Sequence, residues 1–68
     1  MAEQTLTIPV SIYHARLAMR MRQIDLMNRT GIQTSRLSLI ENGHVTPRRD
    51  EMERISKALH VPLSTLWP

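Results

Sequence analysis

The chain has 68 residues, enough for one domain built around one compact core. It contains no cysteine, which excludes disulfide frameworks and thiolate metal sites and fits a reducing cytosol. Nine Lys and Arg residues against six Asp and Glu give a formal charge of +3, and most of the cations are arginine, whose guanidinium suits bidentate contacts with phosphate or guanine.

Residues 1–10, MAEQTLTIPV, form an N-terminal arm in which apolar and polar side chains alternate from Thr5 to Val10. This period suits a short edge strand, because Pro9 cannot join a central one. Two interpretations remain open: a partly ordered arm, or a strand that pairs with a partner chain. From Ser11, a suitable N-cap, the pattern predicts a helix over about 11–20. Its expected inward face carries Ile12, Ala15, Arg16 and Met19.

A second helix is predicted over about 23–30, after a break near residues 20–22. Its expected inward side chains are Leu26, Met27 and Thr30. Gly31 follows directly and can adopt the left-handed conformation that ends helices.

The third predicted helix, at about 34–41, divides its apolar residues between two faces. At about 100° per residue, Leu37 and Ile40 fall about 60° apart on the side that faces the core. The opposite arc carries Thr34, Ser35, Ser38 and Leu39. Leu39 is therefore expected to point away from the core. The dipeptide Asn42-Gly43 ends this helix.

Thr46-Pro47 predicts the opening of a fourth helix, at about 48–59, with Thr46 as N-cap and Pro47 at the first position. Its expected inward side chains are Met52, Ile55, Ser56 and Leu59. Two pairs at i,i+4 spacing, Asp50–Arg54 and Glu53–Lys57, explain its charges structurally. A last helix, at about 63–67, is expected to close the core with Leu66 and Trp67.

The predicted fold is all-α: a four- to five-helix bundle over residues 11–68, with a helix-turn-helix formed by the second and third helices. The run MRQIDLMNRTGIQTSRLSLIENG, residues 21–43, resembles the lambda-repressor-like family (Cro and phage repressors, also called XRE). In that family a Gln opens the second helix, a Gly makes the turn and the third helix ends in Ile-Glu-Asn-Gly. The similarity extends over about 11–67.

The resemblance implies which residues meet DNA. Base contacts are expected from the outer arc of the third helix, with a flanking arginine: Thr34, Ser35, Ser38, Leu39 and Arg36. Arg36 has three open roles, namely reading guanine, holding a phosphate or lying in solvent. Phosphate contacts are expected from Gln23, Gln33, Asn42 and Arg48, and Arg22, His44 and Arg49 are further candidates. Arg16 and Glu41 match a family pair that forms a buried salt bridge.

Three positions depart from the family pattern. Arg22 replaces the Ser or Thr that usually caps the second helix, so its backbone needs another acceptor. Met27 stands where the family prefers Ala. Ile24 and Leu17 are apolar outside the main core, and three roles are open for them: packing the N-terminal arm, packing a dimer partner, or none.

The leading functional interpretation is a sequence-specific double-stranded DNA-binding transcriptional regulator, a repressor of phage, plasmid or bacterial type. It would bind an inverted repeat as a homodimer, with the third helix in the major groove. The alternative is an antitoxin or regulatory subunit that acts mainly through a protein partner. Apolar side chains available for such a partner are Leu6, Ile8, Leu17, Ile24, Leu63 and Trp67.

Other functional classes are not expected. The three histidines, at 14, 44 and 60, have no zinc-binding spacing, and no nucleophile, base and orienting group converge in the predicted layout. We therefore expect no enzyme activity, no cofactor and no small-molecule substrate. Because no apolar run approaches the roughly 20 residues of a membrane span and no signal-peptide pattern opens the chain, a cytoplasmic location is expected.

Overall fold

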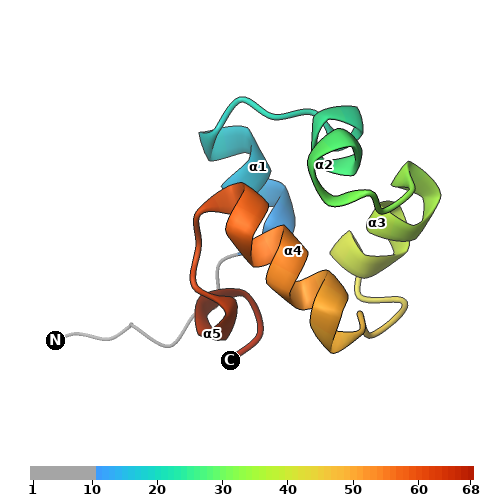
Figure 1. Ribbon diagram of the computed structural model, residues 1–68, viewed down its shortest axis with the longest axis vertical. Helices are drawn as coiled ribbons and strands as arrows, with labels where there is room; N and C mark the ends of the chain where they lie inside the picture. Colours follow the sequence, from blue (N-terminus) through green and yellow to red (C-terminus); the bar gives the residue numbers. More distant parts are fainter. Residues whose placement is uncertain (1–10) are drawn as a thin grey trace, which may run out of the picture.

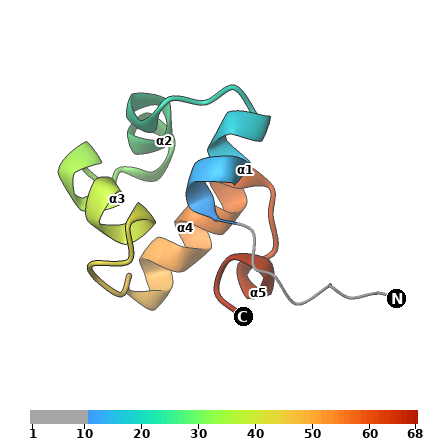
Figure 2. The same ribbon diagram turned by 180° about the vertical axis from the view of Figure 1, so that it is seen from behind.

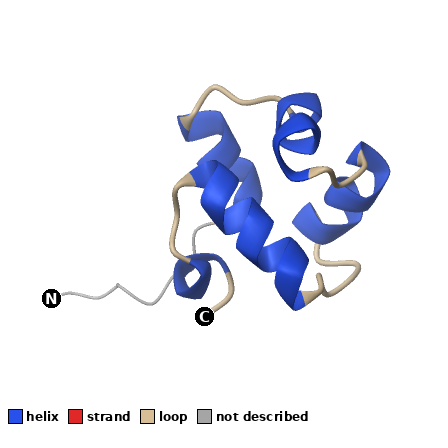
Figure 3. Cartoon of the chain, in the orientation of Figure 1, coloured by secondary structure: helices blue, strands red, loops and turns tan. Residues whose placement is uncertain are grey.

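The computed structural model describes residues 11–68, which form five helices and no strand (Figures 1 and 3). The helices are α1 (Ile12–Ala18), α2 (Gln23–Thr30), α3 (Thr34–Glu41), α4 (Arg49–Leu59) and α5 (Leu63–Leu66). The predicted all-α class is confirmed. Both predictions for residues 1–10, the arm and the edge strand, lie outside the described residues.

Helix α4 runs through the centre of the domain, and the other helices are arranged around it. In Figure 1, α2 and α3 lie on one side of α4, α1 lies behind it, and α5 folds back beside its C-terminal half. Figure 2, seen from behind, shows α1 beside α4 and shows α2 and α3 as neighbours joined by a short turn. Tertiary contacts join α2 to both α3 and α4, and α4 to α5. This arrangement leaves one side of α3 uncovered by the bundle.

The core draws on every helix and on two connecting segments. Its fully buried side chains are Leu26, Leu37, Ile55 and Leu59, and Leu66 joins them from α5. Met27 and Trp67 pack against this core but are only partly buried. Met52 and Ser56, also predicted to face inward, are partly buried too.

Met19 was predicted to face the core, and this is wrong. Met19 is 37% exposed, whereas Met21 is 5% exposed and takes the core position. The reason is local: α1 ends at Ala18, and Arg20 adopts a left-handed conformation with φ of 54°. The Met21 N–H then donates to the Arg16 carbonyl at 2.9 Å, which turns Met21 inward.

A hydroxyl caps the start of α1 but not the start of α4. Ser11 caps α1 as predicted, its hydroxyl accepting from the His14 N–H at 3.1 Å. The prediction of Thr46 as the N-cap of α4 is wrong, because α4 begins at Arg49 and Arg48 is its N-cap. The Glu51 carboxylate accepts from the Arg48 N–H at 2.8 Å and thereby fixes the start of the helix.

Arg22 stands at the N-cap of α2, where a guanidinium cannot accept a hydrogen bond. Asp25 supplies the acceptor instead, since its Oδ2 accepts from the Arg22 N–H at 2.8 Å. The acceptor that the sequence left unidentified is therefore a carboxylate in the first turn of α2.

Glycines end two helices as predicted. Gly31 (φ 76°) follows α2 and Gly43 (φ 74°) follows the last residues of α3, both in the left-handed region that side chains disfavour. His60, at the end of α4, adopts the same region with φ of 56° although it is not glycine.

Arg16 and Glu41, implied as a buried pair by the family resemblance, are joined by two hydrogen bonds. Arg16 Nε donates to Glu41 Oε2 at 2.9 Å and Nη2 donates to Oε1 at 3.1 Å. A third bond runs from Arg16 Nη1 to the Met21 carbonyl at 3.0 Å. The two side chains are 9% and 7% exposed, so the pair ties α1 to the end of α3 inside the fold.

Candidate nucleic-acid interface

The uncovered side of α3 carries the residues that the sequence placed there. Leu37 and Ile40 are 0% and 6% exposed, whereas Leu39 is 43% exposed. Ser35 is exposed beside it, and Thr34 and Ser38 are half-buried. The outer face of α3 therefore presents hydroxyl groups around one isobutyl group, a surface that offers hydrogen bonds and one apolar contact.

The C-terminal end of this face is held by Asn42. Its Nδ2 donates to the Ser38 carbonyl at 2.9 Å and lies 3.5 Å from the Ser38 hydroxyl. The carboxamide thus folds back over the last turn of α3, where both the carbonyl and the hydroxyl of Ser38 accept from it. His44 follows in an exposed loop, where its N–H donates to the Leu39 carbonyl at 2.9 Å.

Two more of the predicted residues stand at the start of α2. Gln23 is the first residue of α2 and is half-buried. Arg22 is 79% exposed, and its guanidinium donates to the two Asp25 oxygens at 3.1 and 3.2 Å. These bonds lower the pKa of Asp25 below its ordinary value and keep it ionised. Gln33 is exposed at the N-cap of α3, and its side chain makes no capping bond there.

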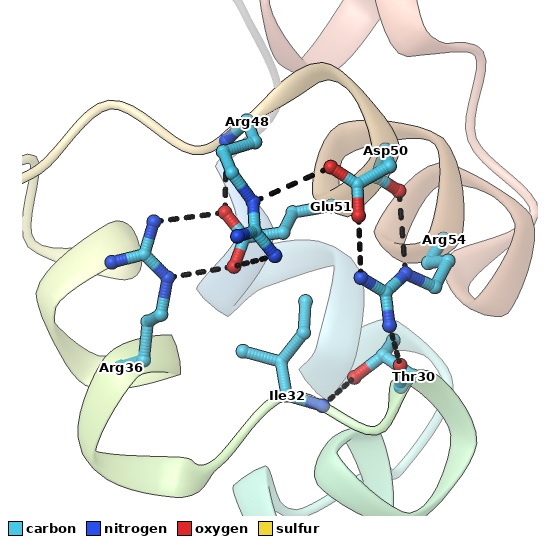
Figure 4. A network of polar contacts seen from close by, with 7 residues as sticks. All are labelled: Thr30, Ile32, Arg36, Arg48, Asp50, Glu51 and Arg54. Carbon is cyan, nitrogen blue, oxygen red and sulfur yellow. Dashed lines mark hydrogen bonds and ion pairs between the residues drawn. The ribbon is translucent and has the colours of Figure 1, made fainter.

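The turn between α2 and α3 is fixed from both sides (Figure 4). Thr30 Oγ1 donates to the Leu26 carbonyl at 2.8 Å and accepts from the Ile32 N–H at 3.2 Å. From α4, Arg54 Nη1 donates to the Thr30 carbonyl at 2.9 Å, and its Nη2 donates to Asp50 at 2.7 Å. The predicted Asp50–Arg54 pair is present. Spacing along α4 gave no sign that Arg54 also reaches the turn, so sequence reasoning missed this role.

Glu51 is the centre of a second polar cluster that the sequence did not predict (Figure 4). Arg36 Nε donates to Glu51 Oε2 at 2.6 Å and Arg36 Nη2 donates to Oε1 at 2.9 Å. Oε1 also accepts the Arg48 N–H, and the carboxylate is 3% exposed. The Arg36 bonds, more than any other contact, lower the pKa of Glu51 from 4.5 to about 2.

None of the three roles left open for Arg36 includes a carboxylate partner, yet Glu51 is where its guanidinium lies. The sequence did contain a signal for the capping role of Glu51, because Glu51 stands three residues after Arg48, the spacing of an acid that caps a helix start. The prediction of Thr46 as the N-cap left that role unrecognised.

The two arginines at the start of α4 are exposed and weakly paired. Arg48 Nε lies 3.4 Å from Asp50 and its Nη2 lies 3.8 Å from Glu51, with a side chain that is 69% exposed. Arg49, 77% exposed, donates to Glu53 at 3.3 Å. The predicted partner of Glu53, Lys57, is therefore replaced by Arg49, which lies one turn earlier on α4.

A groove of about 410 Å³ connects these features between the α2–α3 turn and the start of α4. Its lining combines the turn with side chains of α3 and α4: Gly31, Ile32, Gln33, Ser35, Arg36, Arg48, Glu51 and Arg54. With Asp50, which pairs with Arg54 and lies 3.4 Å from Arg48, the three arginines meet two carboxylates, so this cluster carries one net positive charge.

The described residues contain neither a metal-binding cluster nor a membrane-spanning helix. Over residues 11–68, no three His, Asp or Glu side chains come together as a metal site. None of the five helices has the length and apolar content to cross a membrane.

Comparison with known protein families gave one match for this chain. A family model described as helix-turn-helix matches residues 12–66, which is all five helices. No curated protein and no solved structure matches the chain.

Proposed function

Because the chain belongs to the lambda-repressor-like (XRE-type) helix-turn-helix family of DNA-binding transcription regulators, we propose that it is a repressor that binds a specific double-stranded DNA operator. Helix α3 enters the major groove, and its outer face reads the bases. The flanking arginines and amide groups hold the phosphates and supply most of the affinity.

The observation that carries this proposal is the composition of the uncovered face of α3. Ser35 and Ser38 can donate to or accept from base edges, and Leu39, 43% exposed, suits the methyl group of thymine. Arg22 and Arg48, the N-cap residues of α2 and α4, are largely exposed and can offer a positive charge to a phosphate.

The protein acts as a homodimer on an inverted repeat. A single α3 of eight residues reaches only a few base pairs. Two copies with half-sites about one helical turn apart, roughly 34 to 36 Å, would double the sequence read. Analytical ultracentrifugation of the protein with a palindromic duplex measures this directly, and a stoichiometry of one protein per duplex would contradict it.

Specificity is tested by selecting bound sites from random duplexes and measuring the affinity of the selected site against a scrambled one by fluorescence anisotropy. Ser35→Ala should lower the discrimination by about 1 kcal/mol or more, roughly fivefold or more. Ser64→Ala is the matched control, because Ser64 is exposed on α5, away from α3. Equal affinity of the unmodified protein for both duplexes at several salt concentrations would refute sequence-specific binding.

A second candidate, a regulatory subunit or antitoxin that acts through a protein partner, is favoured by two exposed apolar side chains. Leu17 and Ile24 are 49% and 40% exposed and lie outside the core. If they serve the homodimer, Leu17→Ser/Ile24→Ser should be monomeric in ultracentrifugation. If that variant stays dimeric and keeps its operator affinity, both side chains are free for another chain.

A further inference from the structure

A buried carboxylate lies directly under the basic edge of the α3 surface. Glu51 is 3% exposed, and it makes its shortest contacts with Arg36 of α3, at 2.6 and 2.9 Å, and with the Arg48 N–H, at 2.8 Å. A carboxylate beside these arginines weakens their attraction for DNA. The capping of α4 alone does not explain why Glu51 also binds Arg36.

We infer that Glu51 decides which arginines of this surface reach DNA: it withholds Arg36 from the bases and phosphates and leaves Arg48 available to a phosphate. Glu51 is thus a positioning residue that sets specificity, and the inference rests on the DNA-binding function proposed above. The sequence alone left three roles open for Arg36, namely reading guanine, holding a phosphate or lying in solvent.

The geometry at Arg36 supports its exclusion. Both of its bonds to Glu51 are short and parallel, which is the strong, bidentate arrangement of guanidinium and carboxylate. If Arg36 turned toward DNA, it would leave a buried carboxylate without its main partner, a state that proteins avoid. The low pKa of Glu51 agrees with this, since the carboxylate stays ionised under all ordinary conditions. DNA binding therefore leaves this pair intact.

Arg48 is held in a different way. Its side-chain contacts with Asp50 and Glu51 measure 3.4 and 3.8 Å, longer than good charge-assisted hydrogen bonds, and the side chain is 69% exposed. A phosphate can replace these contacts at little cost. Meanwhile the Arg48 backbone stays fixed by the bond from its N–H to Glu51. One carboxylate thus anchors the backbone of Arg48 and leaves its guanidinium free to exchange partners.

The test is Glu51→Gln, measured as the salt dependence of binding to operator and to scrambled duplex. Gln keeps an oxygen for the Arg48 N–H but releases the charge of Arg36. We expect the slope of log K against log salt to steepen by about 0.9 per protomer, the value for one additional phosphate neutralised. Affinity for scrambled DNA should rise, and the ratio of operator to scrambled affinity should fall.

The double variant Arg36→Gln/Glu51→Gln is the control, because it removes both charges and leaves a polar amide at each position. It should return the slope to the wild-type value and keep the wild-type base preference. Circular dichroism monitors folding, and if Glu51→Gln does not fold, the double variant decides alone.

Two outcomes overturn the inference. The first is a folded Glu51→Gln protein whose salt slope equals that of the wild type. The second is a double variant that has lost preference for a guanine or whose slope is shallower by about 0.9, because Arg36 would then have touched DNA in the wild type. Failure of the wild type to prefer its operator is a separate result, which refutes the proposed function and the inference with it.

Discussion

Replacing Glu41 by Gln tests how far the fold depends on its buried ion pair. Gln retains one acceptor for Arg16 but presents an amide NH₂ to the other guanidinium N–H, so one of the two bonds at 2.9 and 3.1 Å is lost and the arginine charge is left uncompensated. Breaking a buried pair from one side costs about 3 to 5 kcal/mol, and we expect the lower end because one bond survives.

That cost is large for so short a chain. At about 0.05 to 0.15 kcal/mol per residue, a domain of this size is stable by roughly 3 to 10 kcal/mol. A loss of about 3 kcal/mol would lower Tm by about 12 to 24 °C, at 4 to 8 °C per kcal/mol. Glu41→Gln is therefore expected to be partly unfolded near physiological temperature.

Thermal and urea unfolding followed by circular dichroism at neutral pH measure this effect. Glu53→Gln is the matched control, because the Arg49–Glu53 pair is 77% and 60% exposed and its loss should change the stability by less than about 0.5 kcal/mol. A Glu41→Gln protein as stable as Glu53→Gln would refute the reasoning, since water or a rearranged Arg16 would then replace the carboxylate without cost.

Three further predictions concern the turn, the recognition surface and acid stability. Leu39→Ala should keep the fold and reduce preference for thymine at one half-site position by about 1 kcal/mol, roughly fivefold, and an unchanged site profile would make Leu39 an ordinary exposed leucine. Gly31→Ala should cost about 1 to 2 kcal/mol in urea unfolding, because φ is 76° while the new Cβ has room at 3.7 Å from Arg54 Nη1. The folded pKa of Glu51, about 2, lies below its ordinary 4.5, so its contribution to stability is complete above pH 4.5 and is lost as the pH falls toward 2. Arg36→Gln should flatten that acid loss, and identical pH profiles of the two proteins would contradict it.

Short-range signals in the sequence predicted the elements and one essential feature of the surface. Leu37 and Leu39 are the same residue type two positions apart, and helical periodicity alone placed the first inside and the second outside. Gly31 and Gly43 marked the ends of α2 and α3 correctly, because the left-handed conformation is a property of the residue itself.

The sequence-based predictions for Thr46 and Met19 were wrong because each outcome depended on a competing contact. Thr46-Pro47 has the residue types of a helix start, but the Arg48 N–H donates to the Glu51 carboxylate, and α4 begins at Arg49. Met19 continues the inward face of α1, but the left-handed turn at Arg20 gives the core position to Met21.

The sequence by itself determined the helical class, the family and the face of α3 that stays uncovered, because these follow from periodicity and from residues adjacent in the chain. Only the tertiary structure decided what the arginines do. Arg36 lies on Glu51 and Arg54 on the turn at Thr30, across separations of 15 and 24 residues. An arginine side chain is long and its guanidinium donates to any oxygen within reach, so its partner is fixed by the packing of α2, α3 and α4 and not by its place in the chain.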